Sequence, residues 1–281
     1  MQIEGVGKNI LLNDDIVERN FPFEIAYEGD LIYEVVRVID GLPLFWKEHV
    51  DRMIASLNLV GQAGQEIVTA IEGTIRFYIA QNDLENNNIK VIIGNFSEDD
   101  FEYMAYYVPS YYPDQAFYKD GAKVVTLRHE RENPNAKVIN NNLSKRVVDI
   151  RRQTGAYEVA LINHENVITE GSRSNLFFLK DDCVYISQGH KILKGITMHK
   201  VITLFKTLDL VYKEENITQS MLPFFDACFM TSTSNNILPI DSIDAYKFDS
   251  SHHLTIQCLM KAFEELLIED QAIYKTNYKH I

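Results

Sequence analysis

Residues 167–180, VITEGSRSNLFFLK, hold a polar segment between two stretches with the β-branched and aromatic composition of strands. The polar segment, Thr169 to Asn175, combines a carboxylate, a glycine and small hydroxyl residues. An ordinary hairpin loop has the same composition. A second interpretation follows from Glu170, because a carboxylate placed against a pyridine nitrogen keeps that nitrogen protonated and makes the ring an electron sink.

The chain around this segment predicts an α/β protein with two domains. Its 281 residues exceed the usual size of one domain, and the stretch with Pro109 and Pro113 interrupts the periodic segments. We therefore expect domains at 1–112 and 122–281 with a linker at 113–121. Apolar spacing predicts helices at 48–61, 66–81, 141–155, 197–210 and 253–269, and strands at 31–39, 89–96, 104–113, 122–128, 157–163, 175–180, 183–187 and 226–234.

Composition limits the classes of function. The net charge of −13 argues against nucleic acid as a partner, because binding to its phosphates requires clustered Lys and Arg. No segment resembles a signal peptide or an apolar run of bilayer length, so we expect no membrane partner. The three cysteines form neither a CxxC pair nor a Cys/His metal pattern and predict reduced thiols in the cytoplasm: Cys183, Cys228 and Cys258.

Lys137, in NPNAKVINNNLSKR, is the candidate nucleophile of the chain. It lies where a strand-and-loop segment gives way to a helix. A lysine that forms a Schiff base must be partly desolvated so that its amine can react near neutral pH, and it can then carry a proton to and from a substrate carbon. Lys123 and Lys145 are local competitors, but Lys145 falls on a charged helix face.

Three further segments could bind a phosphate. Leu193 to Thr197 opens a helix with a glycine, and backbone N–H groups at a helix start bind anions. The segment from Thr231 to Ser234 offers consecutive hydroxyls after a strand. Arg52 can hold a phosphate through two parallel hydrogen bonds, although pairing with Glu48 one helical turn away explains it equally well. An ordinary helix start and a polar turn explain the first two segments as well.

These segments, in this order, resemble the class IV, or fold-type IV, pyridoxal-phosphate enzymes, which include branched-chain aminotransferases, D-amino acid aminotransferases and aminodeoxychorismate lyases. The specific pieces are the TEGSxSN motif, Asn140 three residues after Lys137, and GAYE at 155–158. The resemblance covers GDLIYEVVRVIDGLPLFWKEHVDRM, AKVINNNLSKRVVDIRRQTGAYEVALIN, VITEGSRSNLFFLK, ILKGIT and FMTSTSNNILPI.

The resemblance implies a role for each matching residue. Lys137 would form the Schiff base with pyridoxal 5'-phosphate, Glu170 would face the pyridine nitrogen, and Tyr33 would line the substrate pocket. The fold implied is a small N-terminal α/β domain and a larger barrel-like C-terminal domain with the cofactor between them, usually in a homodimer. The implied phosphate contacts are Arg52, Ile196, Thr197, Ser232 and Thr233.

The chain also departs from the family pattern. Leu31 and Ile32 replace the Gly-Val of the usual FGDGVFE motif, and Ile93 stands where D-amino acid enzymes carry an arginine. We therefore expect an aminotransferase that acts on an amino acid and a 2-oxo acid, branched-chain-like and not of the D-amino acid type. A lyase of the same family and a non-catalytic homologue remain alternatives. Candidate partners for the substrate carboxylate are Lys90, Arg128, Arg131 and Arg173.

Overall fold

A computed structural model describes residues 2–25, 30–82, 84–96, 100–131 and 133–278 of the chain. Its contacts divide the chain into two compact units. The domain limits expected from the sequence remain a prediction. The two units differ from them because the short segments 136–139 and 267–281 group with the N-terminal part of the chain. The first unit comprises 1–111, 136–139 and 267–281, and the second comprises 112–135 and 140–266.

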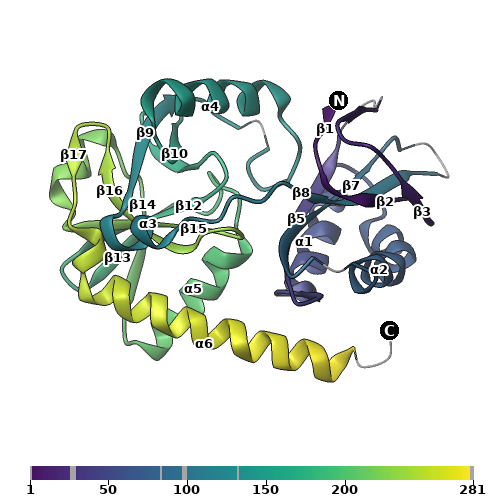
Figure 1. Cartoon of the computed structure of the whole chain (residues 1–281). Helices are drawn as coiled ribbons and strands as arrows, with labels where there is room; N and C mark the ends of the chain where they lie inside the picture. Colours follow the sequence, from purple (N-terminus) through teal and green to yellow (C-terminus); the bar gives the residue numbers. More distant parts are fainter. Residues whose placement is uncertain (1, 26–29, 83, 97–99, 132, 279–281) are drawn as a thin grey trace. The chain divides into compact units, whose positions relative to one another are not determined.

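The first unit is built on a six-stranded antiparallel sheet with the order β3-β2-β8-β7-β5-β6. Helices α1 (Trp46–Leu59) and α2 (Gly64–Ala80) contact each other, and α1 also contacts β5, as Figure 1 shows. A short pair of strands, β1 (Gln2–Ile3) and β4 (Phe23–Glu24), lies outside this sheet. The sheet strands are β2 (Val6–Leu12), β3 (Asp15–Glu18), β5 (Ile32–Ile39), β6 (Leu42–Pro43), β7 (Asn86–Gly94) and β8 (Glu102–Val108).

Strand β5 shows why this unit folds as it does. Its residues alternate between buried and half-buried, with Ile32, Val36 and Val38 in the core. Glu34 occupies the same buried register, so a carboxylate enters the apolar face. The dipeptide Asp40-Gly41, which is typical of a tight turn, ends this strand, and both residues have positive φ, of 52° and 74°, as a two-residue hairpin turn requires.

The second unit is built on a nine-stranded mixed sheet with the order β11-β10-β9-β16-β15-β12-β13-β14, and β17 pairs with β16. The sheet curls, because edge strand β11 also contacts β12 and β13, and the Ser187 hydroxyl donates to the Ile168 carbonyl at 2.5 Å. The strands are β9 (Ala122–Arg128), β10 (Glu158–Ile162), β11 (Ile168–Gly171), β12 (Asn175–Lys180), β13 (Cys183–Ser187), β14 (Val211–Glu215), β15 (Ala227–Ser232), β16 (Asn236–Ile243) and β17 (Tyr246–Lys247).

Helices complete the second unit. Helix α5 packs against β15, and α4 against β10 (Figure 1). The expected α/β class with a barrel-like larger part is confirmed. The helices of this part are α3 (Gln115–Asp120), α4 (Asn141–Thr154), α5 (Ile196–Thr207), the 3-10 turns Gln219–Phe224 and Ser250–His252, and α6 (Leu254–Asn277), whose last residues belong to the first unit.

The structure adds elements to the sequence expectations in two places and corrects one interpretation. The segment expected as a linker contains α3, which begins where the Asp114 carboxylate accepts hydrogen bonds from the N–H groups of Ala116 and Phe117. The strands before residue 30 were not expected. The hairpin interpretation of 167–180 is wrong, because β11 pairs with β10 while β12 pairs with β13 and β15.

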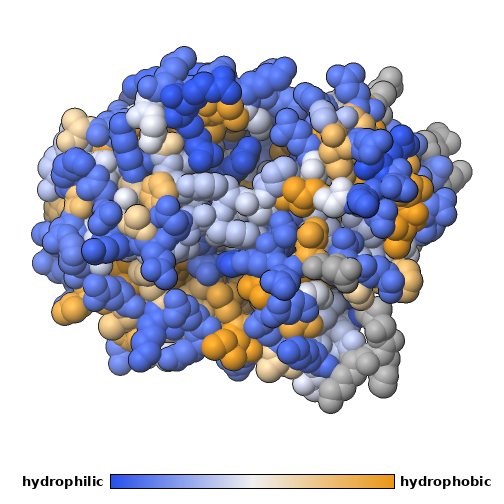
Figure 2. All heavy atoms as spheres, in the orientation of Figure 1, coloured by the Kyte–Doolittle hydropathy of each residue, from blue (hydrophilic) through white to orange (hydrophobic). Residues whose placement is uncertain are grey.

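The surface is mostly hydrophilic on the face shown in Figure 2. Helix α6 carries exposed apolar residues along its length, including Leu254, Ile268 and Ile273. No helix within the described ranges is long and apolar enough to cross a bilayer.

Candidate active site

Lys137 is fixed in the first unit by its backbone. Its carbonyl accepts from the Tyr33 N–H at 3.0 Å, and its own N–H donates to the Ser56 hydroxyl at 3.3 Å. The next residues continue the contact, since Ile139 N–H donates to the Leu31 carbonyl and Val138 bridges to Ile32. The side chain is half-buried, with Nζ 4.8 Å from the centre of the Tyr33 ring. The structure thus brings together the two residues predicted as nucleophile and pocket wall.

Arg52 lies on the face of α1 that bears Ser56, four residues later. Its Nε and one terminal nitrogen donate to the two carboxylate oxygens of Glu34, both at 2.7 Å. His49 Nδ1 lies 2.7 Å from the same carboxylate, and the Glu34 side chain is fully buried. A buried cluster of Glu34, His49 and Arg52 therefore holds the predicted phosphate-binding guanidinium in one orientation.

Burial sets the protonation of this cluster. It lowers the pKa of the His49 ring, the charges of Arg52 and Lys137 lower it further, and contact with Glu34 opposes them. Burial alone would raise the pKa of the Glu34 carboxyl, yet the Arg52 guanidinium and the His49 ring hold it well below its ordinary value. Neutral His49 can therefore donate to ionised Glu34 while Arg52 keeps the positive charge.

Stability should fall as the pH falls below about 6.5, the ordinary value for His49. The unfolded ring binds a proton there while the folded ring resists it, so the unfolded chain takes up more protons. The stabilisation from Glu34 is present above its unfolded pKa of about 4.5 and is lost as the pH falls through the lower folded pKa. Denaturant titrations at pH 7.5, 6.5 and 5.5 measure the free energy of unfolding. Its decrease with falling pH should be shallower in His49→Gln than in the wild type. An unchanged slope in that variant would contradict the role of His49.

Glu170 lies in β11 of the second unit and is buried. Arg131 Nε lies 2.8 Å from one of its carboxylate oxygens, and the Leu193 N–H donates to the other at 3.2 Å. The positive charge of Arg131 stabilises an ionised carboxylate in this position. Arg131, one of the candidate partners for a substrate carboxylate, is thus paired with Glu170.

Glu158 orders the turn that follows Glu170. Its carboxylate accepts from the hydroxyls of Ser172 at 2.6 Å and Ser174 at 2.9 Å, and the Gly171 N–H donates to the Ser174 carbonyl. A side chain at Gly171 would meet the Ser174 hydroxyl at 2.0 Å. The GAYE and TEGS motifs therefore work together, because the first holds the second in place.

The start of α5 is a close-packed cradle. The Asn175 amide donates to the Leu193 carbonyl at 2.8 Å, and a Cβ on Gly195 would lie 2.2 Å from the Asn175 amide oxygen. Asn175 pairs across the sheet with Thr231, so both side chains face the start of α5. The Thr231 hydroxyl is buried, and within the described part of the chain no group hydrogen-bonds to it. Ile196 and Thr197 begin the helix, and Ser232 and Thr233 follow Thr231.

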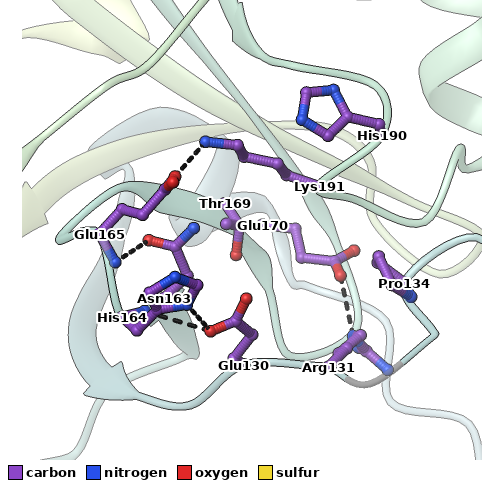
Figure 3. Close-up of a pocket in the computed structure, with 10 residues that line it drawn as sticks. All are labelled: Glu130, Arg131, Pro134, Asn163, His164, Glu165, Thr169, Glu170, His190 and Lys191. Carbon is purple, nitrogen blue, oxygen red and sulfur yellow. Dashed lines mark hydrogen bonds and ion pairs between the residues drawn. The ribbon is translucent and has the colours of Figure 1, made fainter.

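A polar cavity of about 270 Å³ opens beside Glu170 in the second unit (Figure 3). The Glu170 carboxylate points towards Arg131, and His190 and Lys191 come from the loop after β13. Ion pairs between His164 and Glu130 and between Lys191 and Glu165 line the same cavity. Sequence reasoning missed these pairs, because each joins residues more than 20 positions apart.

The units place the predicted residues in two groups. Lys137, Tyr33 and Arg52 belong to the first unit. In YEGDLIYE at 27–34, where the chain departs from the FGDGVFE motif, residues 27–29 lie outside the described residues. The second unit holds Glu170, Ile196, Thr197, Ser232 and Thr233.

A comparison with protein families identifies the family of the chain. The family model for amino-transferase class IV matches residues 31–243. The chain belongs to the class IV aminotransferases. It is therefore an enzyme of this type, and the matched range contains every site residue named above.

Class IV aminotransferases of two named activities are similar to the chain. A probable branched-chain-amino-acid aminotransferase of Rickettsia typhi is 24% identical over 264 residues, covering 87% of this chain and 90% of the relative. A D-alanine aminotransferase of Listeria innocua is 28% identical over 262 residues, covering 84% of this chain and 87% of the relative. The two relatives carry different names at similar identity, so identity alone does not choose between their substrates.

Solved structures share the fold of this class IV aminotransferase. A branched-chain amino acid aminotransferase with pyridoxamine 5'-phosphate, from the organism abbreviated T.th., has a TM-score of 0.79 at 22% identity and covers 97% of this chain and 98% of its own. The Escherichia coli branched-chain amino acid aminotransferase has a TM-score of 0.77 at 22% identity and covers 92% of this chain and 94% of its own.

Proposed function

We propose that this class IV aminotransferase binds pyridoxal 5'-phosphate covalently through Lys137 and moves an amino group between an amino acid and a 2-oxo acid. The observation that carries the proposal is the placement of Lys137, whose backbone is hydrogen-bonded to Tyr33 and Ser56 and whose half-buried Nζ faces the Tyr33 ring. A lysine whose backbone is held in this way can react with a bound cofactor without a rearrangement of the chain.

The side chains present fit such a cofactor. The buried Thr231 hydroxyl and the backbone N–H groups at the start of α5 offer hydrogen-bond donors to an anion, and Gly195 lets the Asn175 amide pack directly against this backbone. Arg52, Ile196, Thr197, Ser232 and Thr233 would hold the phosphate. Glu170, paired with Arg131, has the charge required opposite a protonated pyridine nitrogen.

The bound cofactor would supply an electron sink for the negative charge left at the substrate Cα. The residues of the chain would do the rest. Lys137 Nζ would take the proton from Cα and return it on the cofactor side, as a general base and then a general acid. Tyr33 would limit how the substrate lies beside Lys137, and the Glu34 carboxylate would keep Arg52 oriented towards the phosphate.

For the substrate, we infer a branched-chain-like amino acid in preference to a D-amino acid. Ile93 is buried in the core and pairs with Ile32, so this position offers no charge to a carboxylate. The inference rests on this residue, because relatives of both named activities match the chain at similar identity. The homodimer and the cytoplasmic location implied by the resemblance and the composition stay predictions.

The test is the absorbance of the purified protein loaded with pyridoxal 5'-phosphate. Leucine, isoleucine or valine should convert the visible band to that of pyridoxamine phosphate, and a 2-oxo acid should restore it. The D-enantiomers serve as matched controls and should convert it far more slowly. A band that no amino acid shifts would reject the aminotransferase, and release of pyruvate from aminodeoxychorismate would then identify the lyase.

Gly195→Ala should weaken cofactor binding by about 10-fold or more, because the new methyl group would displace the Asn175 amide from the Leu193 carbonyl. Titration of the cofactor-free protein with pyridoxal 5'-phosphate measures this. Gly73→Ala is the control, since nothing lies within 4 Å of a Cβ at that helical glycine. Equal affinity of the two variants would contradict the cradle at α5.

A further inference from the structure

Tyr33 is flanked by two lysines. Lys137 Nζ lies 4.8 Å and Lys90 Nζ 5.0 Å from the centre of its ring. We propose that Lys90 binds the α-carboxylate of the substrate while the amino group of that substrate reacts beside Lys137. This inference rests on the proposed function, because it assumes an amino acid at Lys137.

The sheet register fixes Lys90 on the side of Tyr33. In the antiparallel pair of β5 and β7, Tyr33 is opposite Ile92 and Lys90 is two residues away, so the two side chains are diagonal neighbours on one face. Tyr106 of β8 is directly opposite Lys90. Rigid strands therefore position this ammonium group, as a specificity contact requires.

The two ring distances limit the separation that the substrate has to bridge. Both ammonium groups lie within 5.0 Å of one ring centre, so they are at most about 10 Å apart. The carboxylate carbon of an amino acid lies about 2.5 Å from its amine nitrogen. A charged N–H···O contact adds about 2.8 Å. Such a bridge reaches about 5.3 Å in all, so the assignment requires the two ammonium groups to lie well within this upper limit of about 10 Å.

The surroundings of Lys90 strengthen such a contact. Lys90 and Tyr33 are half-buried, while Ile92, Met104 and Tyr106 on the same sheet face are buried. Apolar neighbours lower the local dielectric, so an ammonium and a carboxylate attract each other more strongly there than in water.

The other candidate cations have different settings. Arg131 is paired with Glu170, Arg128 donates to the Asn166 amide oxygen at 2.6 Å, and Arg173 is exposed. All three belong to the second unit. Among the four candidates, Lys90 is the one that shares an aromatic neighbour with Lys137.

The experiment measures binding without turnover. Calorimetry would compare 4-methylpentanoate, which is leucine without its amino group, with its neutral amide on the pyridoxal-phosphate-loaded protein. The wild type should prefer the carboxylate, and Lys90→Met should weaken carboxylate binding about 10- to 100-fold while leaving the amide unchanged. Lys90→Arg should retain most of the preference. Lys8→Met, at an exposed position of β2, is the control.

Each contrary outcome overturns the assignment of Lys90. These outcomes are equal binding of carboxylate and amide to the wild type, an unchanged preference in Lys90→Met, and equal weakening of both ligands. If Lys90→Met weakened the binding of the dicarboxylate glutarate but not of 4-methylpentanoate, Lys90 would not bind the α-carboxylate. Failure of the proposed function looks different, because the carboxylate preference would persist while no amino acid converts the visible band.

Discussion

Lys137→Ala is expected to lose the visible band that borohydride fixes in the wild type. Amino transfer should fall by at least about 10²–10⁴-fold, which is the usual share of a positioned acid–base group alone. Removal of the Nζ deletes both the covalent attachment and the proton carrier. The measurement is an absorbance spectrum before and after borohydride, followed by the rate of conversion with leucine.

The variant should fold, because the hydrogen bonds of Lys137 to Tyr33 and Ser56 use its backbone N–H and carbonyl, which alanine retains. Two lysines serve as matched controls. Lys145 is exposed on α4, and Lys123 Nζ is exposed and donates to the Thr154 carbonyl at 2.7 Å. Alanine at either position should leave the band in place. Loss of the band in Lys145→Ala and its retention in Lys137→Ala would exchange the roles of the two lysines.

Local pattern made much of the fold predictable. The alternation in 31–39 and the Asp40-Gly41 turn predict the hairpin that presents Tyr33, and the structure confirms it. Apolar spacing likewise predicts α1, α2, α4 and α5, whose ends agree with the expectation to within a few residues. Such signals depend on neighbours along the chain, and a single sequence contains them.

Long-range pairing was not predictable in the same way. Spacing along α1 offered Glu48 as a partner for Arg52, whereas the carboxylate that holds Arg52 is Glu34, on a different element. The pair of Arg131 and Glu170 joins residues 39 positions apart. The early strands are short and partly polar, so their alternation is weak, and they pair with one another and with the distant strand β8.

Glu34→Ala is expected to lower the free energy of unfolding by about 3–5 kcal/mol, the usual cost of removing one partner from a buried ion pair. The loss is large because Arg52 and His49 would remain buried without the Glu34 carboxylate. The Arg52 side chain is only 12% exposed, and His49 is 2% exposed, so neither can recover its lost hydrogen bonds from bulk water. Urea denaturation at pH 7.5 measures the change.

Asp51→Ala is the matched control on the same helix. Asp51 forms its ion pair with Lys47 in an exposed setting, where solvent screens the attraction and the pair contributes little to stability. The two variants should therefore differ by several kcal/mol although each loses one carboxylate. Similar small losses in both would show that Arg52 does not depend on Glu34.

The same pair links stability to the proposed phosphate contact. Glu34→Gln keeps the shape of the side chain but removes the charge that opposes Arg52, so it should destabilise the fold less than Glu34→Ala while still loosening the guanidinium. If Arg52 binds the cofactor phosphate, Glu34→Gln should bind pyridoxal 5'-phosphate more weakly, and adding Arg52→Ala should cause little further loss. Fully additive losses of affinity in the double variant would show that Glu34 acts on the cofactor by a route other than Arg52.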